Sequence, residues 1–431
     1  MYLKDLDIDY FRFIIFSSSP MTLLIANEKE TRQNGLNTTM NKKQIRVLLV
    51  EDSPVAIILL KRILTSTPDI EVVGTARTGL EGLQMIPVVK PNVICTDLHM
   101  PQMNGLEFTI EVMANCPRPI LVISASVQPE NKQNVFELLA AGAIDVFPKP
   151  RAGMSANYET IKQELITKIR VLSGVSVFTL HRKPNLHQIQ SKTTPAQNPS
   201  FSNVQTFPDP KLITKISSPK PPEKSVVTPF AKDDSAKLSL QRYRIVTIGA
   251  STGGPQALQT ILTQLPPKFP VPVICIQHIS LGFLQGLVDW LGRECRLPVQ
   301  IAPFGEVPKP GHIYFPPEAK HLEFDRQGRF IHSSAEPYTG HRPSVTVTFN
   351  SIANYYGRFA VGILLTGMGR DGADGMQAIS QSGGLTIAQD EPSSVVFGMP
   401  KEAIALGAAK HILPVKEIAP LLVNQLFVNY F

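Results

Sequence analysis

The order of apolar and polar segments is the feature that most limits how this chain can fold. From Ile45 to Lys149, five short apolar segments alternate with stretches typical of helices. The predicted strands are Val47–Val50, Glu71–Ala76, Val93–Asp97, Pro119–Ser124 and Asp145–Phe147. Alternation of this kind predicts an α/β domain, a doubly wound parallel sheet with helices on both faces.

A second alternation begins near Tyr243. Its predicted strands are Arg244–Ala250, Val271–Gln277, His312–Phe315 and Phe359–Thr366. Residues 184–229 contain nine prolines among Ser, Thr, Gln and Lys, a composition that cannot build a core. We therefore expect a disordered extension over 1–43, a first α/β domain over 44–170, a flexible linker over 171–242 and a second α/β domain over 243–431.

Charge and cysteine content narrow the class of protein. The net charge is +7, but residues 176–240 hold nine Lys or Arg against four Asp or Glu, so most of the excess lies in the predicted linker. We therefore expect no nucleic-acid partner. The four cysteines form no CxxC pair, which favours a reduced, cytoplasmic protein. The apolar run over 11–26 is interrupted and too short to span a bilayer, so we expect no membrane insertion.

Polar residues gather where the strands of the first domain end. Glu51 and Asp52 follow the first strand, and Asp97 ends the third. Three carboxylates in one pocket repel one another unless a cation binds them, and Mg²⁺ accepts such a set. Ser124 and Lys149 end two further strands on the same edge, and a hydroxyl and an ammonium suit a phosphoryl group.

These residues resemble those of the receiver domains of two-component response regulators. The matching segments are Val50–Ser53, Asp97–Pro101 with Gly105, Ser124–Ala125 and Phe147–Pro150. The resemblance implies a flavodoxin-like fold and a histidine kinase that phosphorylates Asp97. It further implies that Glu51, Asp52, Asp97 and the carbonyl of His99 bind Mg²⁺, with Ser124 and Lys149 contacting the phosphoryl group.

One position departs from the receiver pattern. Many receivers carry an aromatic residue three positions before the lysine, where this chain has Val146, followed by Phe147. Adjacent strand residues point to opposite faces. We therefore expect the usual aromatic switch not to operate here.

Three strands of the second domain end in groups of catalytic type. Ser251 follows the first strand, His278 ends the second, and Asp371 lies in a glycine-rich loop after a third. If these strands are parallel neighbours, all three side chains face one crevice. Ser251 is then a nucleophile, His278 its general base and Asp371 the group that orients the imidazole.

The loops around this triad offer donors for an oxyanion. The N–H of Thr252 opens a helix, and that of Met368 lies in a glycine turn; one such donor contributes about 3–4 kcal/mol. We expect no cofactor in this domain. We expect the other histidines to be solvated or hydrogen-bonded rather than catalytic, namely His99, His181, His187, His312, His321, His332, His341 and His411.

The second domain resembles the chemotaxis protein-glutamate methylesterases. The matching segments are Gly249–Gly254, Gln277–His278, His341–Val345, Leu365–Gly372 and Val396–Pro400. The resemblance implies a Rossmann-like fold, hydrolysis of glutamate γ-methyl esters and deamidation of glutamines on chemoreceptors (methyl-accepting chemotaxis proteins). A receiver in front of such a domain implies that phosphorylation activates it, and we expect the unphosphorylated receiver to cover the Ser251 crevice.

Two other classes of function compete with this interpretation. In a non-enzymatic phospho-switch, the loop Gly249–Gly254 would bind a phosphate or a partner without catalysis. A DNA-binding response regulator would instead carry a helix-turn-helix after the linker.

Overall fold

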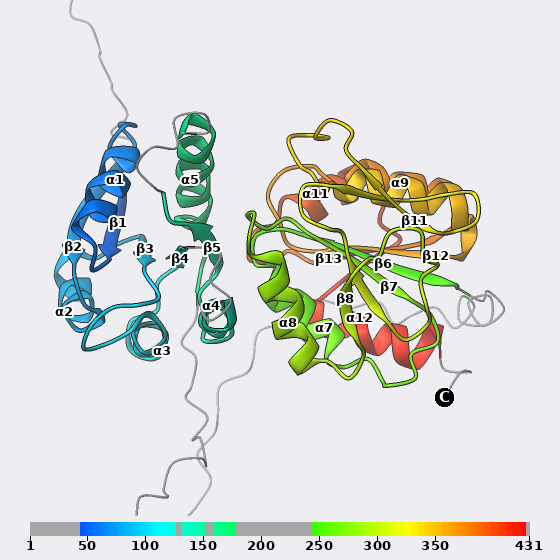
Figure 1. Ribbon diagram of the computed structural model, residues 1–431, viewed down its shortest axis with the longest axis horizontal. Coiled ribbons are helices and arrows are strands. Elements are labelled where there is room, and N and C mark those ends of the chain that lie inside the picture. The colour runs from blue at the N-terminus through cyan, green and yellow to red at the C-terminus, as the bar shows by residue number, and fades with distance from the viewer. Residues whose placement is uncertain (1–43, 126–131, 151–157, 178–242, 428–431) are drawn as a thin grey trace, which may run out of the picture. The chain divides into compact units, whose positions relative to one another are not determined.

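The computed structural model describes residues 44–125, 132–150, 158–177 and 243–427. The predicted extension over 1–43 and most of the predicted linker lie outside the described residues. The described chain contains two parallel sheets with helices on both faces, one in each α/β domain (Figure 1).

The first domain is a five-stranded parallel sheet of order β2-β1-β3-β4-β5. Its elements are β1 (Ile45–Val50), α1 (Pro54–Leu64), β2 (Ile70–Ala76), α2 (Gly79–Val89), β3 (Val93–Thr96), α3 (Gly105–Asn115), β4 (Ile120–Ser124), α4 (Lys132–Ala140), β5 (Asp145–Pro148) and α5 (Tyr158–Leu172). All five predicted strands are present, within one or two residues of the predicted bounds. The strand order reverses between β1 and β3, and such a reversal opens a crevice at the carboxyl ends of those strands.

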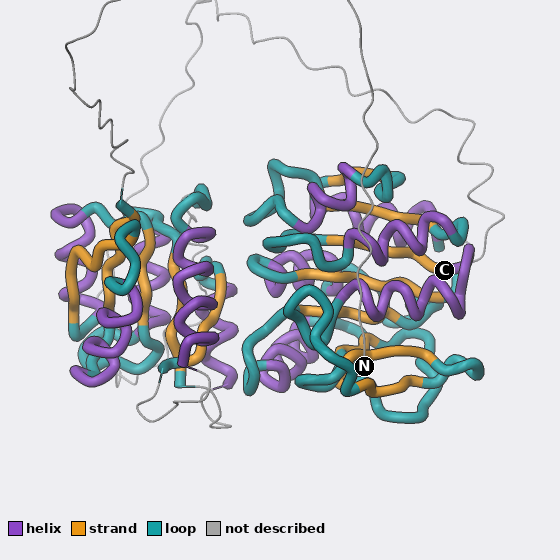
Figure 2. The backbone as a smooth tube through the Cα atoms, turned by 90° about the horizontal axis from the view of Figure 1, so that it is seen from above, coloured by secondary structure: helices purple, strands orange, loops and turns teal. Residues whose placement is uncertain are grey.

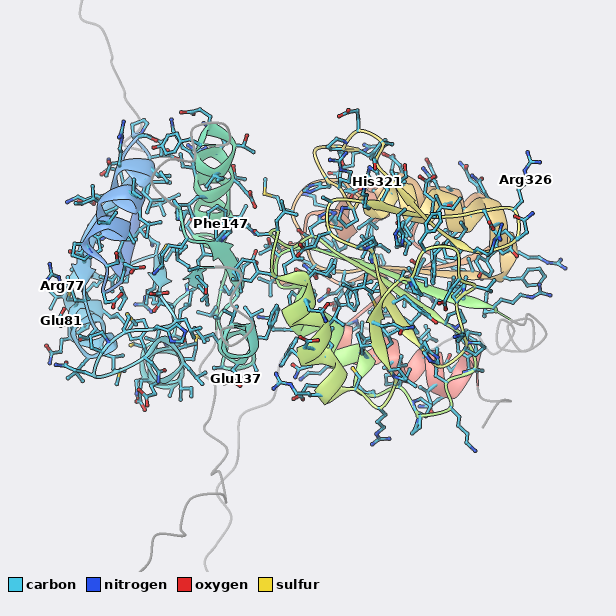
Figure 3. The ribbon with its side chains drawn as sticks, viewed as in Figure 1. Arg77, Glu81, Glu137, Phe147, His321 and Arg326 are labelled. Carbon is cyan, nitrogen blue, oxygen red and sulfur yellow. The ribbon has the colours of Figure 1, made fainter. Side chains whose placement is uncertain are left out.

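The two faces of this sheet bury separate cores. Helices α1 and α5 cover one face and α2, α3 and α4 the other (Figure 1). Phe147 (labelled in Figure 3) is fully buried with Leu165 and Ile169 on the α5 face. Val146 packs with Val122 on the opposite face. Phe147 is therefore a core residue of the first domain.

The second domain is a seven-stranded sheet of order β14-β13-β12-β6-β7-β9-β8, parallel throughout. Figure 2 shows its strands running side by side. Its elements are β6 (Ile245–Ala250), α7 (Gly254–Leu262), β7 (Val273–Gln277), α8 (Leu284–Glu294), β8 (Val299–Ile301), β9 (Ile313–Phe315), β10 (His321–Phe324), β11 (Phe330–Ser333), α9 (Val345–Tyr356), η1 (Gly357–Phe359), β12 (Ala360–Leu364), α10 (Ala373–Gln381), β13 (Leu385–Gln389), α11 (Met399–Ala405), β14 (His411–Leu413), α12 (Val415–Leu421) and η2 (Leu422–Leu426).

The central strands β6, β7 and β12 are buried along their whole length, because helices cover both faces of the sheet. Helices α7, α8 and α12 pack on one face, and α9, α10 and α11 on the other. Among the described residues, no helix combines the length and the apolar character that a bilayer crossing requires.

The sequence prediction of two doubly wound parallel sheets is confirmed. It was incomplete in the second domain, since it missed β8, β13, β14 and the antiparallel pair β10–β11. Strands β8 and β14 have only three residues each and are not fully buried, so their apolar pattern is weak. The β10–β11 pair lies outside the main sheet and follows no βα repeat.

We predict that Phe147→Ala lowers the unfolding free energy of the first domain by about 3–5 kcal/mol, because it leaves a cavity at a fully buried site. Hydrogen exchange of the β1–β5 peptides in a urea series measures this loss. The control is Val88→Ala, since Val88 is 78% exposed on α2 and its truncation changes stability by about 0.5 kcal/mol or less. Equal effects of the two substitutions would contradict the core position of Phe147.

Candidate functional site

The register of three central strands brings the candidate catalytic segments to one edge of the second sheet. Ala250 pairs with Gln277 across β6 and β7, so Ser251 and His278 are the next residues on adjacent strands. The N–H of His278 donates to the carbonyl of Ala250 at 3.0 Å. On the other side, the N–H of Ser251 donates to the carbonyl of Thr366, beyond the end of β12, also at 3.0 Å. The predicted convergence on one edge therefore follows from parallel pairing.

Asp371 is a buried carboxylate, 2% exposed, at the amino end of α9. It accepts hydrogen bonds from Ser344 Oγ (2.8 Å), the N–H of Val345 (2.8 Å), the N–H of Thr346 (3.0 Å), the N–H of Gly372 (3.0 Å) and His278 Nε2 (2.8 Å). Burial alone would raise the pKa of Asp371, but His278 and the donors at the start of α9 lower it well below its usual range. Asp371 is therefore ionised and fixed in position.

His278 contacts this carboxylate through one ring nitrogen only. With Nε2–H donating to Asp371, the second nitrogen, Nδ1, is buried and has no hydrogen-bond partner among the described residues. No hydrogen bond joins Ser251 Oγ to His278 in the part of the chain that the structure describes. The structure thus brings His278 and Asp371 into direct contact, and it leaves Nδ1 as the imidazole atom able to accept a proton.

The turn that carries Ser251 is shaped by glycine. Gly253 has φ of +75° and is the N-cap of α7, and the N–H of Gly254 donates to the carbonyl of Ser251 at 2.8 Å. A Cβ at Gly367 would lie 2.7 Å from Ser251 Cβ, so the loop that carries Met368 approaches the serine closely. The N–H groups of Thr252 and Met368 make no hydrogen bond within the described residues.

Sequence reasoning gave no role to two residues whose side chains contact the side chain of Asp371 or His278. Ser344 is fully buried and donates to Asp371, although only a serine before a helix marked it in the sequence. His341 stacks on His278, with ring centroids 3.9 Å apart and planes 8° from parallel. The sequence analysis expected His341 to be only solvated or hydrogen-bonded, and it did not predict this stacking. His321 does behave as expected, since it is buried and both its ring nitrogens are hydrogen-bonded.

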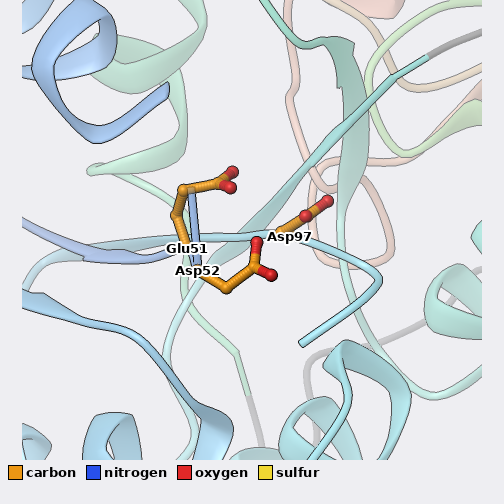
Figure 4. A group of neighbouring side chains, drawn as sticks. All are labelled: Glu51, Asp52 and Asp97. Atoms are coloured by element: carbon orange, nitrogen blue, oxygen red, sulfur yellow. The ribbon is translucent and has the colours of Figure 1, made fainter. Parts of the chain in front are cut away.

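A second candidate site lies at the carboxyl edge of the first sheet. Carboxylate oxygens of Glu51, Asp52 and Asp97 all lie within 4.8 Å of one another (Figure 4). Lys149 Nζ lies 2.7 Å from Asp97 Oδ2 and 2.9 Å from Glu51 Oε2. The predicted acidic cluster and its lysine are thus in contact.

The electrostatics of this cluster suit a cation. Burial raises the pKa of Asp97, and Asp52 adds to the shift, while Lys149 opposes it. Burial and the charge of Asp97 likewise raise the pKa of Glu51. One ammonium therefore does not balance three carboxylates, and oxygen ligands of this kind fit a hard divalent ion.

Ser124 and His99 are the two remaining predicted residues of this edge. Ser124 is buried at the end of β4, and its carbonyl accepts the N–H of Lys149 at 2.8 Å. His99 is exposed two residues after Asp97. No hydrogen bond joins the Ser124 hydroxyl to Asp97 among the described residues.

Comparison with known proteins defines the class of this chain. Residues 47–155 match the family model of the response regulator receiver domain, and residues 246–422 match that of the CheB methylesterase. The class is therefore a hydrolase domain joined to a phosphorylation-dependent receiver.

Curated relatives identify the family. A protein-glutamate methylesterase/protein-glutamine glutaminase of Nitrosospira multiformis is 38% identical over 88% of this chain and 96% of the relative. One from Syntrophus aciditrophicus is 37% identical over 88% of this chain and 98% of the relative. The CheB methylesterase catalytic domain of Thermotoga maritima is 37% identical, with a TM-score of 0.42, over 42% of this chain and 98% of that structure. The chain belongs to the CheB family of protein-glutamate methylesterases/protein-glutamine glutaminases.

We predict that His341 makes stability pH-dependent. Burial, and then the proximity of His278, lowers the pKa of His341 from 6.5 to about 4. Between these values the unfolded chain binds a proton that the folded chain does not, so stability falls as the pH is lowered, by up to about 1.4 kcal/mol per pH unit. His341→Phe keeps a ring but cannot titrate, and urea midpoints across this window should show a shallower slope. An unchanged slope would contradict the prediction.

Proposed function

We propose that this chain hydrolyses glutamate γ-methyl esters and deamidates glutamines on chemoreceptors, with Ser251, His278 and Asp371 as its catalytic residues. The observation that carries the residue assignment is the 2.8 Å contact between His278 and the buried Asp371. His278 directly follows β7, which pairs with β6, the strand that leads into the serine turn. Membership of the CheB family supports the substrate assignment.

The proposed reaction uses His278 as a proton carrier. Ser251 Oγ attacks the γ-carbonyl carbon of the substrate while His278 Nδ1 accepts the hydroxyl proton. Methanol, or ammonia from a glutamine, then leaves with that proton and an acyl-serine forms. Water attacks the acyl carbon, His278 again accepts and returns a proton, and a glutamate carboxylate is released. Ionised Asp371 stabilises the imidazolium in both steps.

In both steps negative charge develops on the carbonyl oxygen. The N–H groups of Thr252 and Met368 are the proposed donors, since neither is used by another described group. The amino end of α7, which begins three residues after Ser251, adds a favourable dipole.

The proposal extends to the first domain as a phosphorylation switch. Asp97 is the proposed phosphoryl acceptor and a histidine kinase the proposed donor, supported by the match to receiver domains. Glu51, Asp52, Asp97 and the His99 carbonyl would hold Mg²⁺, which neutralises phosphate charge when bound. Lys149, 2.7 Å from Asp97, and Ser124 would contact the added phosphoryl group. The unphosphorylated receiver restrains the hydrolase in this proposal.

The proposal locates this activity in the cytoplasm. All four cysteines are unpaired, as expected for a reducing compartment. The alternative of a non-catalytic phosphate loop at Gly249–Gly254 is not favoured, because every relative reported above is named for a hydrolase. A DNA-binding output is not favoured either, because residues 246–422 match a methylesterase family.

We predict that Ser251→Ala lowers the release of methanol from methylated chemoreceptor, and of ammonia from its glutamines, by about 10⁴-fold or more, since the nucleophile is removed. Gas chromatography and an ammonia assay measure the two products. Ser382→Ala, at an exposed serine that ends α10, is the matched control and should keep wild-type rates. Comparable rates for both variants would remove the assignment of Ser251.

We predict that Asp97→Asn abolishes activation by a phosphodonor. Acetyl phosphate with Mg²⁺ should raise methanol release by the wild-type chain, whereas the variant, or the wild type in EDTA, should stay at its basal rate. Glu159→Gln, at an exposed carboxylate on α5, should respond like the wild type. Activation of Asp97→Asn equal to that of the wild type would exclude Asp97 as the acceptor.

A further inference from the structure

Gln277 is a buried polar residue that the proposed reaction does not use. It is the last residue of β7 and is 4% exposed. Its side-chain Nε2 donates to the carbonyl of Ser251 at 2.7 Å and to the carbonyl of His278 at 2.9 Å. One amide group therefore contacts the main chain of both the proposed nucleophile and the proposed base.

The side chain of Gln277 is held in one position. A Cβ at Gly254 would lie 2.0 Å from Gln277 Oε1, so the amide packs directly against the first residue of α7. Oε1 itself is buried and has no hydrogen-bond partner among the described residues. A buried carbonyl without a hydrogen bond destabilises the fold. A glutamine present here despite that cost points to a role for its NH₂ group, which makes both hydrogen bonds.

The hydrogen bond to Ser251 fixes the direction of the next N–H. In a planar trans peptide the C=O and the N–H point in opposite directions. The carbonyl of Ser251 accepts from Gln277 Nε2 and also from the N–H of Gly254 at 2.8 Å. The N–H of Thr252, in the same peptide plane, therefore points away from Gln277, and it makes no hydrogen bond within the described residues.

The following peptide is held in the same way from the neighbouring strand. Thr366 Oγ1, 1% exposed, donates to the carbonyl of Thr252 at 3.0 Å. Two buried side chains thus contact successive carbonyls of the serine turn. Gln277, at the end of β7, contacts the carbonyl of Ser251, and Thr366, just beyond β12, contacts that of Thr252. The turn is held through its carbonyls, and the N–H of Thr252 is left for a ligand.

We propose that Gln277 is a positioning residue for catalysis, which aims the N–H of Thr252 at the oxygen that becomes negative in the transition state. This inference rests on the proposed function, because it requires an acyl carbon bound to Ser251. Gln277 contacts no reacting atom and acts through the Ser251–Thr252 peptide. Its loss weakens transition-state binding and leaves substrate binding nearly unchanged.

Gln277→Met tests this, since methionine has nearly the same length and no donor. We expect kcat for methanol release by the full-length chain to fall about 100-fold, because a misdirected oxyanion donor is largely lost. KM should stay within about 3-fold, and ammonia release should fall by the same factor as methanol release. Gln264→Met makes the same chemical change at an exposed glutamine, whose Nε2 donates to the carbonyl of Thr260, and should have wild-type kinetics.

A pH profile distinguishes an effect on the direction of the Thr252 N–H from an effect on the position of His278. The acid limb of kcat/KM should not move in Gln277→Met, whereas a displaced His278 would shift it. Gln277→Leu also lacks a donor and provides a second variant if the methionine chain does not fold, with the same expected loss of kcat. A kcat within about 3-fold of wild type, a loss confined to KM, or a shifted acid limb would overturn the inference. Ser251→Ala is measured in parallel. Its activity tests the proposed nucleophile, and so the proposed function, independently of any effect at Gln277.

Discussion

Parallel pairing of β6 with β7 and β12 is the constraint on which the second domain depends. These strands are fully buried between two different sets of helices, so their register is set by which side chains pack on each face. Register in turn decides which residues meet at the carboxyl edge, as the pairing of Ala250 with Gln277 does for Ser251 and His278. A one-residue slip would turn these side chains to opposite faces, so core packing and the geometry of the proposed catalytic site are specified together.

The two domains stabilise buried negative charge in different ways. Asp371 is surrounded by donors that belong to the fold itself, which lower its pKa. Asp97 and Glu51 have one lysine between them, and their pKa values are raised. The first carboxylate is therefore a permanent part of its site. The second pair lies in an acidic cluster that could hold a cation, and Asp97 is the acceptor in the proposed phosphorylation switch.

Sequence patterns predicted both sheets and the residues at their edges because buried parallel strands are apolar and end in conspicuous polar groups. Asp97, Ser251 and His278 follow such strands directly, and the structure places each where the pattern indicated. The short strands β8 and β14 left too weak a pattern, and the β10–β11 pair follows no repeat. Ser344, His341 and Gln277 were not given roles because their contacts depend on loops whose course is set by tertiary packing.

The way in which Asp371 is anchored leaves the outward-facing surface of α9 free to vary, although core residues such as Phe349 and Ile352 fix its inner face. Apart from the side chains of Ser344 and His278, its hydrogen bonds come from main-chain N–H groups, which every residue except proline supplies. The outward-facing surface of this helix, including Asn350 and Asn354, lines a shallow hollow of about 440 Å³ beside β10. Substitutions on that surface, by evolution or in the laboratory, would therefore leave the Asp371 carboxylate and its hydrogen bonds in place.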